Sequence, residues 1–218
     1  APTSSFTVSG STITFAANLV TGDVINFIQI LGSVLDLGVP SDATVSTAKI
    51  VDGAVTSAKL ASGVGGITMA DQWRLTANQS GGTNAIVTSN LERVDTDGFG
   101  QLGTGMTESS GVFTFPSTGI YLIQLIGFIN IRADAAGNVS IETTTDNSTF
   151  TDACIVTAGN NDSSGVQQSV AGNFIFDVTN TSTHKFHLKT HSMASGSYLM
   201  GETDRNRTAI TIIRLGDT

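Results

Sequence analysis

The sequence predicts a mainly β fold, and three observations support this fold class. Apolar and polar residues alternate over short stretches, turn signals recur about every eight to twelve residues, and Gly, Ser, Thr and Asn are abundant. This pattern is typical of an antiparallel sandwich or barrel made of many short strands. With 218 residues, the chain is long enough to bury a sizeable core.

Residues 1–37 are predicted to form a small β attachment domain. The alternation from Phe6 to Ile30, interrupted by the turn signals SG and TGD, indicates about three strands. Three strands alone are marginally stable in water, so we expect this domain to complete its core against a partner.

Residues 38–66 are predicted to form a stalk, because they contain a ten-residue repeat in which VSTAKIVDG at 45–53 is followed by VTSAKLASG at 55–63. Each copy is too short for an independently stable helix. Its few apolar positions are Val45, Ile50, Val55 and Leu60. Chains that wind together would bury these positions against one another. The alternative is a flexible linker with an accidental duplication.

Residues 67–218 are predicted to form the main domain, which we call the head. About ten strand-like segments follow one another there, separated by turn residues. The segments are 73–77, 84–94, 111–115, 119–131, 137–145, 150–157, 168–178, 184–192, 197–201 and 207–215.

The segment 119–131, GIYLIQLIGFINI, is apolar on both faces. Successive side chains of a strand point to opposite sides. One side carries Tyr121, Ile123 and Leu125, and the other carries Ile120, Leu122 and Gln124. One face can serve the core of the head, whereas the other needs a cover that a neighbouring subunit would supply. The candidates for the core or for a subunit interface are Phe113, Tyr121, Ile123 and Leu125.

The stretch GVFTFPSTGIYLIQL at 111–125 resembles the signature of the C1q/TNF-like jelly rolls. In that family a Phe is followed, after five residues, by Gly, any residue, Tyr and two alternating apolar or aromatic residues. These places are held by Phe113, Gly119, Tyr121, Ile123 and Leu125. The chain departs from the pattern upstream, where Met106 replaces an aromatic residue or Leu and Gln101 replaces Asn or Asp.

Trp73 and the ending SYLMGETDRNRTAITIIRL at 197–215 are also similar to the first and last strands of this family. The resemblance therefore spans residues 73–218. It implies a ten-strand antiparallel jelly-roll sandwich that assembles as a homotrimer around a threefold axis. The core or interface candidates in the head and the apolar positions of the repeat thus become candidates for the trimer interface.

The repeat resembles a connector common in the tail fibres and head fibres of tailed bacteriophages. A foot, a repeat stalk and a jelly-roll head together are similar to a trimeric fibre or decoration protein of a virion. This implies a non-enzymatic protein at the particle surface, attached to capsid or tail proteins through its N-terminal part. Its head would decorate the particle or adhere to a host surface glycan or protein. The alternatives are a secreted C1q/TNF-like ligand and a polysaccharide depolymerase.

Charge and hydropathy argue against nucleic acid and membrane as partners. The chain has a formal net charge of −8, and its ten Lys and Arg residues form no basic run. Because binding to phosphates needs clustered cations, nucleic acid is disfavoured as a partner. The most apolar run, 119–131, is too short for a membrane-spanning helix and is interrupted by Gln124 and Asn130.

No catalytic, cofactor or metal site is predicted from the motifs. GFGQLG at 98–103 matches a dinucleotide-binding pattern, but the following residues do not indicate the helix that this chemistry needs. DTDGFG at 95–100 has Met106 where an EF-hand requires Glu, which leaves a looser calcium site as the alternative. Cys154, the single cysteine, is expected to be a buried structural thiol. The sequence contains no G-x-S-x-G nucleophile motif.

The histidines His184, His187 and His191 are expected to lie on a strand rather than to bind zinc. THKFHLKTH alternates so that His187 and His191 face outward with two lysines, which disfavour a metal, and we expect a solvated edge. The loops at 159–165 and 193–197 are expected to be tips of the head, without assigned contact residues.

Overall fold

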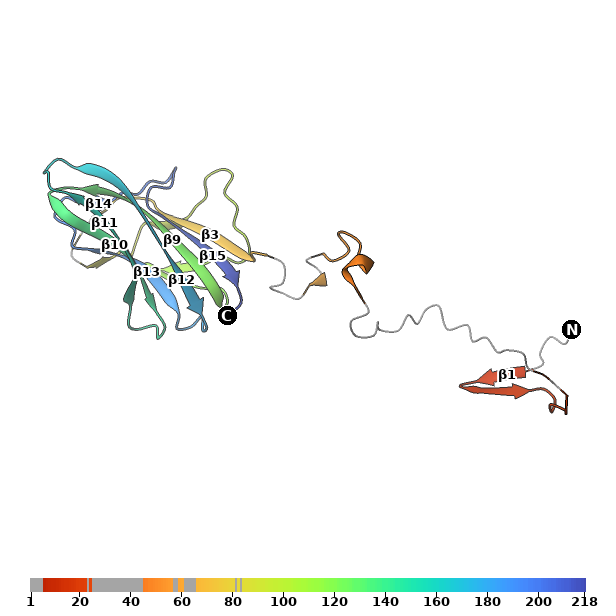
Figure 1. Cartoon of the computed structure of the whole chain (residues 1–218). Coiled ribbons are helices and arrows are strands. Elements are labelled where there is room, and N and C mark those ends of the chain that lie inside the picture. The colour runs from red at the N-terminus through yellow and green to blue at the C-terminus, as the bar shows by residue number, and fades with distance from the viewer. Residues whose placement is uncertain are drawn as a thin grey trace. The chain divides into compact units, whose positions relative to one another are not determined.

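The structure is a computed structural model, and it describes residues 6–22, 24, 45–56, 59–60, 66–80, 82 and 84–218. The chain divides into two units, Ala1–Ala54 and Val55–Thr218 (Figure 1). The predicted domain limits of 1–37, 38–66 and 67–218 remain predictions.

The N-terminal unit contains a β-hairpin of β1 (Phe6–Ser9) and β2 (Thr12–Phe15). The register pairs Phe6 with Phe15 and Val8 with Ile13, which places these four apolar side chains on one face and hydroxyl side chains on the other. The third strand expected near residues 24–30 lies outside the described residues, apart from Val24.

The two copies of the repeat contain the same backbone hydrogen bond at equivalent positions. In the first copy, which contains the 3₁₀ helix η1 (Thr47–Lys49), the backbone N–H of Lys49 donates to the carbonyl of Ser46 (2.9 Å). In the second copy, the N–H of Lys59 donates to the carbonyl of Thr56, also at 2.9 Å. These two hydrogen bonds join equivalent positions ten residues apart, so the described residues of the two copies share this backbone contact. A single 3₁₀ turn of this kind is a short connector element.

The head is a sandwich of two antiparallel sheets (Figure 1). Its strands are β3 (Met69–Leu75), β4 (Gln79–Ser80), β5 (Ala85–Ile86), β6 (Leu91–Arg93), β7 (Thr107–Ser109), β8 (Val112–Thr114), β9 (Gly119–Ile131), β10 (Asp134–Thr144), β11 (Thr151–Asn160), β12 (Val166–Val178), β13 (Lys185–His191), β14 (Tyr198–Leu199) and β15 (Ala209–Gly216). The seven-stranded sheet has the order β4-β14-β9-β15-β3-β6, with β12 also paired to β9. The six-stranded sheet has the order β11-β10-β13-β8-β7, with β5 also paired to β13.

The predicted mainly β fold and the antiparallel jelly-roll sandwich are confirmed by this topology. The expected segment 84–94 is two strands, because the chain turns at Asn90, whose φ is +60°. Its first part, β5, joins the six-stranded sheet and its second part, β6, joins the seven-stranded sheet. The alternation therefore identified strand residues but not the change of sheet between them.

The core lies between the two sheets and is centred on aromatic side chains. Phe113 of β8 stacks on Phe186 of β13 at 4.7 Å between ring centroids, and Trp73 meets the Phe113 ring edge-on at 5.4 Å. Phe115 contacts both Tyr121 and Phe186. These rings bury large apolar areas in well-defined geometry, which makes this cluster a main source of the head's stability.

A buried carboxylate fixes the first strand of the head to the loop that precedes β7. Asp71 accepts hydrogen bonds from Trp73 Nε1 (3.0 Å), from Arg93 Nε (3.0 Å) and from the backbone N–H of Met106 (2.8 Å). A buried charge is tolerated when it is paired and hydrogen-bonded in this way.

The described part of the chain has no helix long and apolar enough to span a lipid bilayer.

Candidate functional site

The outer face of the seven-stranded sheet carries a continuous row of apolar side chains. Strand pairing aligns Ile175 of β12 with Leu122 of β9, Leu122 with Ile213 of β15, and Ile213 with Ala70 of β3. Ile175 is 59% exposed in the single chain. We call these four residues the apolar row.

A polar row lies next to the apolar row on the same face. The register aligns Asn173, Gln124, Thr211 and Gln72 across the same four strands. Gln72 Nε2 donates a hydrogen bond to Thr211 Oγ1 (2.8 Å), so the row is partly satisfied within the chain. Its residues are uncharged amides and a hydroxyl, which can hydrogen-bond a partner without the cost of burying an ion.

The third row on this face is mainly apolar again. It aligns Ala171, Ile126, Ala209 and Arg74, and Ile126 is 41% exposed. Arg74, the one charged residue in the three rows, is buried and ion-paired with Glu92 and Asp95. We call the three rows together the open face.

The open face has the composition of an interface that one chain leaves partly uncovered: of its residues only Ala209 and Arg74, at one end of the third row, are buried within the chain. Its two outer rows are mainly aliphatic, its middle row is neutral, and its single cation is already neutralised within the chain. Soluble proteins rarely expose a contiguous apolar patch without a binding partner. The chemistry of this face therefore suits a neutral, largely apolar protein surface.

The head residues predicted as core or interface candidates lie on the inner side of their strands. Phe113, Tyr121, Ile123 and Leu125 are 0% exposed within the single chain and belong to the core between the sheets. The alternate positions of β9, beginning with Leu122, contribute to the open face instead.

The repeat positions have a different environment from these core residues. Val45 is 52% exposed, Ile50 is 42% exposed, Val55 is 50% exposed and Leu60 is half-buried. These apolar side chains thus lack a full cover within the described part of the chain. Their burial between chains remains a prediction.

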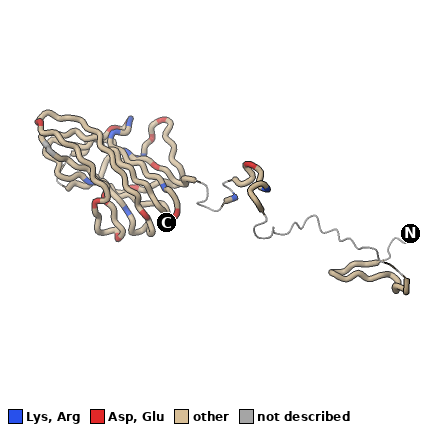
Figure 2. The backbone as a smooth tube through the Cα atoms, in the orientation of Figure 1, with Lys and Arg blue, Asp and Glu red and all other residues tan. Residues whose placement is uncertain are grey.

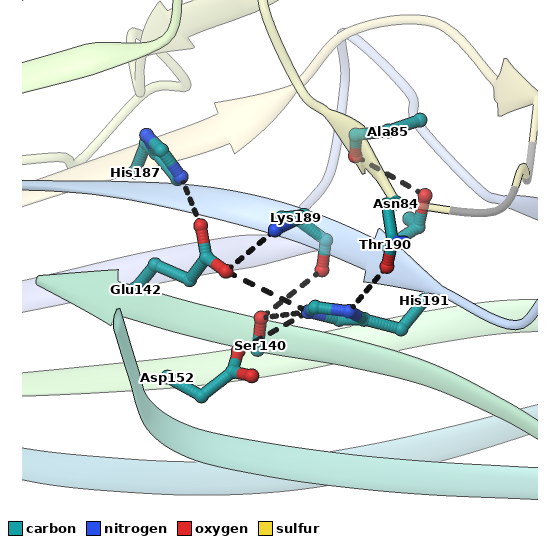
Figure 3. A network of polar contacts seen from close by, with 9 residues as sticks. All are labelled: Asn84, Ala85, Ser140, Glu142, Asp152, His187, Lys189, Thr190 and His191. Carbon is teal, nitrogen blue, oxygen red and sulfur yellow. Dashed lines mark hydrogen bonds and ion pairs between the residues drawn. The ribbon is translucent and has the colours of Figure 1, made fainter. Parts of the chain in front are cut away.

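A network of charged and polar side chains lies on the outer face of the six-stranded sheet (Figure 3). Glu142 of β10 is buried and accepts hydrogen bonds from His187 Nε2 (2.6 Å) and Lys189 Nζ (2.8 Å), both on β13. The ring of Phe150 stacks on His187 at 4.2 Å between centroids. The expectation that His187 lies on a solvated edge is wrong, because Phe150 covers it and only 2% of it is exposed.

His191 continues the network toward the solvent (Figure 3). Its Nδ1 lies 2.9 Å from Asn84 Oδ1, and its Nε2 lies 2.8 Å from Ser140 Oγ and 3.1 Å from Asp152 Oδ1. Ligand atoms of Glu142, Asp152 and His191 lie within 4.8 Å of one another. Lys189 already places an ammonium group on Glu142, so the network supplies its own cation.

The stability of the head is expected to fall as the pH drops below about 6.5, the ordinary pKa of His187. Burial, the largest cause, lowers the pKa of His187 in the folded head, although the hydrogen bond and charge of Glu142 act in the opposite direction. Between the lowered pKa and 6.5 the unfolded chain binds more protons than the folded chain, so stability decreases with acidification across that window. The melting temperature at constant ionic strength between pH 8 and pH 5 measures this effect.

A His187→Gln variant is expected to lose this part of the pH dependence, because its amide donates to Glu142 without titrating. His184→Gln is the matched control, since His184 is bonded to the hydroxyls of Thr179 and Thr183 rather than to a carboxylate. An unchanged pH profile in His187→Gln would contradict the assignment of this pH dependence to His187.

Asp146 does not contribute to the change between pH 8 and pH 5. Hydrogen bonds, led by the one from the Thr149 N–H, lower its pKa to about 2.

The glycine-rich stretch at 95–103 is a loop, as expected. It leads through the isolated bridge between Leu102 and Ala70 into β7, without the helix that a dinucleotide site needs. Asp95, considered for a looser calcium site, is ion-paired with Arg74.

Cys154, which we expected to be buried, is only half-buried. It packs against the core from the edge strand β11.

No protein-family model and no curated protein matches the sequence. Among solved structures, Eiger TNF from S. frugiperda is similar with a TM-score of 0.54 and 10% identity, over 71% of this chain and 96% of that one. Murine APRIL at pH 8.5 is similar with a TM-score of 0.50 and 12% identity, over 67% of this chain and 98% of that one. The PRD1 vertex protein P5 has a TM-score of 0.41 at 17% identity, over 70% and 100% of the two chains.

At these low identities the similarity establishes the fold and nothing further about activity. Eiger TNF and APRIL both align over nearly their whole length. The head thus has the TNF-like jelly-roll fold that residues 111–125 led us to expect.

Proposed function

We propose that this chain is a homotrimeric structural and adhesion protein of a virus particle. Its N-terminal part attaches to capsid or tail proteins, and its head lies at the particle surface. There it decorates the particle or adheres to a host surface glycan or protein. It works by binding alone, without catalysis, a cofactor, nucleic acid or membrane insertion.

The observation that carries the trimer is the open face. In a threefold assembly each head lends its neighbour a cover, so that Ile175, Leu122 and Ile213 leave the solvent. Burial of apolar surface stabilises association by about 25 cal/mol for each Å² removed from water. The TNF-like fold supports the same arrangement, because the jelly rolls that residues 111–125 resemble form trimers.

The virion assignment is supported by the repeat, which resembles phage fibre connectors and has the same backbone hydrogen bond at equivalent positions of its two copies. A trimer would also explain how a head with weak individual sites adheres to a surface. Three sites on one rigid head raise the effective concentration of the second and third contacts, so the overall affinity exceeds that of each site.

A secreted C1q/TNF-like ligand is the second candidate, favoured by the similarity of the head to Eiger TNF and APRIL. A polysaccharide depolymerase is the third. It would release reducing ends from host capsule or lipopolysaccharide, and we expect no such release.

Electron microscopy of intact virions labelled with antibodies against the head tests the proposed location. We expect the label at the particle surface, on the capsid or on the tail. Virions that carry no label, although the antibody binds the purified protein, would exclude the virion role and favour the secreted ligand.

Replacing the apolar repeat positions by serine is expected to loosen the N-terminal part while the head stays trimeric. The positions are Val45, Ile50, Val55 and Leu60. If chains bury them against one another, serine removes that burial without touching the open face. Limited proteolysis should then cleave within residues 38–66 faster than in the wild type, at unchanged mass of the head. Dissociation of the head instead would make the repeat the organiser of the trimer.

A further inference from the structure

Three loops of the head meet at one end of the sandwich. The N–H of Ala133, after β9, donates to the carbonyl of Asp162 (2.7 Å), and the N–H of Arg132 donates to Ser197 Oγ (3.0 Å). We call residues 132–133, 160–165 and 192–197 the tip. It contains most of both loops that the sequence indicated as tips.

The tip lies at the far end of the head from the start of β3. Both Met69 at the start of β3 and Tyr121 near the start of β9 align with Arg214, so the chain enters the head beside the beginning of β9. Arg132 follows the end of this 13-residue strand, which at ~3.3 Å per residue places it roughly 40 Å away. The cyan connection between β11 and β12 lies opposite the C-terminus in Figure 1.

The side chain of Arg132 is held between two of these loops. A Cβ atom on Gly165 would lie 3.2 Å from Arg132 Cγ, and a Cβ on Gly196 would lie 3.6 Å from Arg132 Cδ, so both glycines border the arginine stem. Arg132 Nε donates to the carbonyl of Ser163 (3.0 Å). The stem is therefore fixed, while the residue remains exposed.

Among the residues whose side chains the structure describes, which do not include Asp134, Arg132 differs from the other arginines in having no carboxylate partner. The arginines that form ion pairs are Arg74, Arg93, Arg205, Arg207 and Arg214. Along the backbone tube of the head in Figure 2, the Lys and Arg positions are scattered among acidic and neutral ones. A guanidinium that is oriented by a hydrogen bond at Nε keeps its terminal nitrogens for a planar, two-oxygen acceptor.

We propose that Arg132 forms a binding site for the carboxylate of an acidic sugar, three copies of which would lie on one trimer. This inference rests on the proposed adhesion function and names the chemistry of its ligand. The tip also carries exposed neutral polar residues that suit sugar hydroxyls: Asn161, Ser163, Ser164, Ser192 and Ser195. The tip exposes no large apolar side chain among its described residues, so it lacks the anchors that a peptide ligand uses.

The one described carboxylate of the tip, Asp162, is engaged locally. Its Oδ1 accepts a hydrogen bond from the N–H of Ser164 (2.9 Å), which lowers its pKa and keeps it ionised. This negative charge, together with the net charge of −8, repels a polyanion from the chain as a whole. Binding of an acidic polysaccharide would therefore report a local site rather than general electrostatic attraction.

Binding of the full chain to immobilised polygalacturonate tests the site, with carboxyl-reduced polygalacturonate and poly-L-glutamate as the other probes. We expect the wild type to bind polygalacturonate about tenfold or more tightly than either of these, because the acid and the sugar both contribute. Arg132→Gln should lose about tenfold in affinity, and Arg132→Lys should lose part of it, since lysine keeps the charge without the planar fork.

Arg205→Gln is the matched control, because Arg205 is an exposed arginine outside the tip and its loss changes the net charge equally. It should bind like the wild type. The site is overturned if Arg132→Gln binds polygalacturonate as tightly as the wild type does, or if Arg205→Gln loses as much affinity as Arg132→Gln. It is also overturned if the wild type binds poly-L-glutamate as tightly as polygalacturonate, or does not bind polygalacturonate. If the wild type and Arg132→Gln adsorb equally to host cells, adhesion stands and this site is wrong. If the wild type does not adsorb at all, the adhesion function itself fails.

Discussion

Replacing Leu122 by lysine is expected to convert the head from a trimer into a monomer. Leu122 lies in the apolar row of the open face, between Ile175 and Ile213. In a single chain the lysine stem can lie along these neighbours while the ammonium stays in water. In a trimer the ammonium would be buried without a carboxylate, a cost of several kcal/mol that each interface would bear. Light scattering at micromolar concentration measures the change in mass.

Ile86→Lys provides the control for this variant. Ile86 is also an exposed aliphatic residue, 41% exposed, but it belongs to the six-stranded sheet. This variant should remain trimeric, and both variants should keep the far-ultraviolet spectrum of a β protein. A trimeric Leu122→Lys protein, or dissociation in both variants, would show that the open face is not the trimer interface.

Replacing Phe113 by alanine is expected to lower the free energy of unfolding of the head by about 3–5 kcal/mol, the usual cost of removing a buried aromatic ring. Phe113 is 0% exposed, stacks on Phe186 and receives the edge of Trp73. The cavity would lie in the centre of the aromatic cluster, where the surrounding rings cannot close it without leaving their own positions. Urea denaturation followed by tryptophan fluorescence measures the loss, because the single tryptophan is next to the site.

Phe6→Ala is the comparison for this core variant. Phe6 is 53% exposed and belongs to the N-terminal unit, so its removal should leave the unfolding of the head within about 0.5 kcal/mol of the wild type. A loss below about 1 kcal/mol in Phe113→Ala would mean that the aromatic cluster is not tightly packed.

The strands of the head were predictable because long strands carry a long alternation. The segments expected at 119–131, 168–178 and 207–215 correspond closely to β9, β12 and β15. The short polar strands β4 and β7 were missed, since two or three residues contain too few side chains for a period to be recognised. Their pairing is decided by neighbouring strands far away in the sequence.

The environment of His187 was not predictable from its own segment. The alternation assigned it correctly to the outer side of its strand, but the cover comes from Phe150 and the hydrogen-bond acceptor comes from Glu142, 45 residues earlier. A pattern within one strand specifies a side of the sheet, whereas exposure depends on what packs there. The pairing of Glu142 with His187 and Lys189 on another strand leaves no local signal in the sequence.

The open face was predictable only in part. The second apolar side of residues 119–131 indicated that something covers Leu122, which is the reasoning that led to a subunit interface. The division into an apolar row, a polar row and a third row depends on the register of four strands, which a single sequence does not contain. The same holds for Arg132, whose flanking glycines come from two distant loops.

Sedimentation equilibrium of the full wild-type chain tests the central claim, the trimer built on the open face, most directly. At micromolar concentration we predict one species with three times the 22.5 kDa mass of the chain. A species of 22.5 kDa across this concentration range would contradict the claim, because the open face would then remain in water.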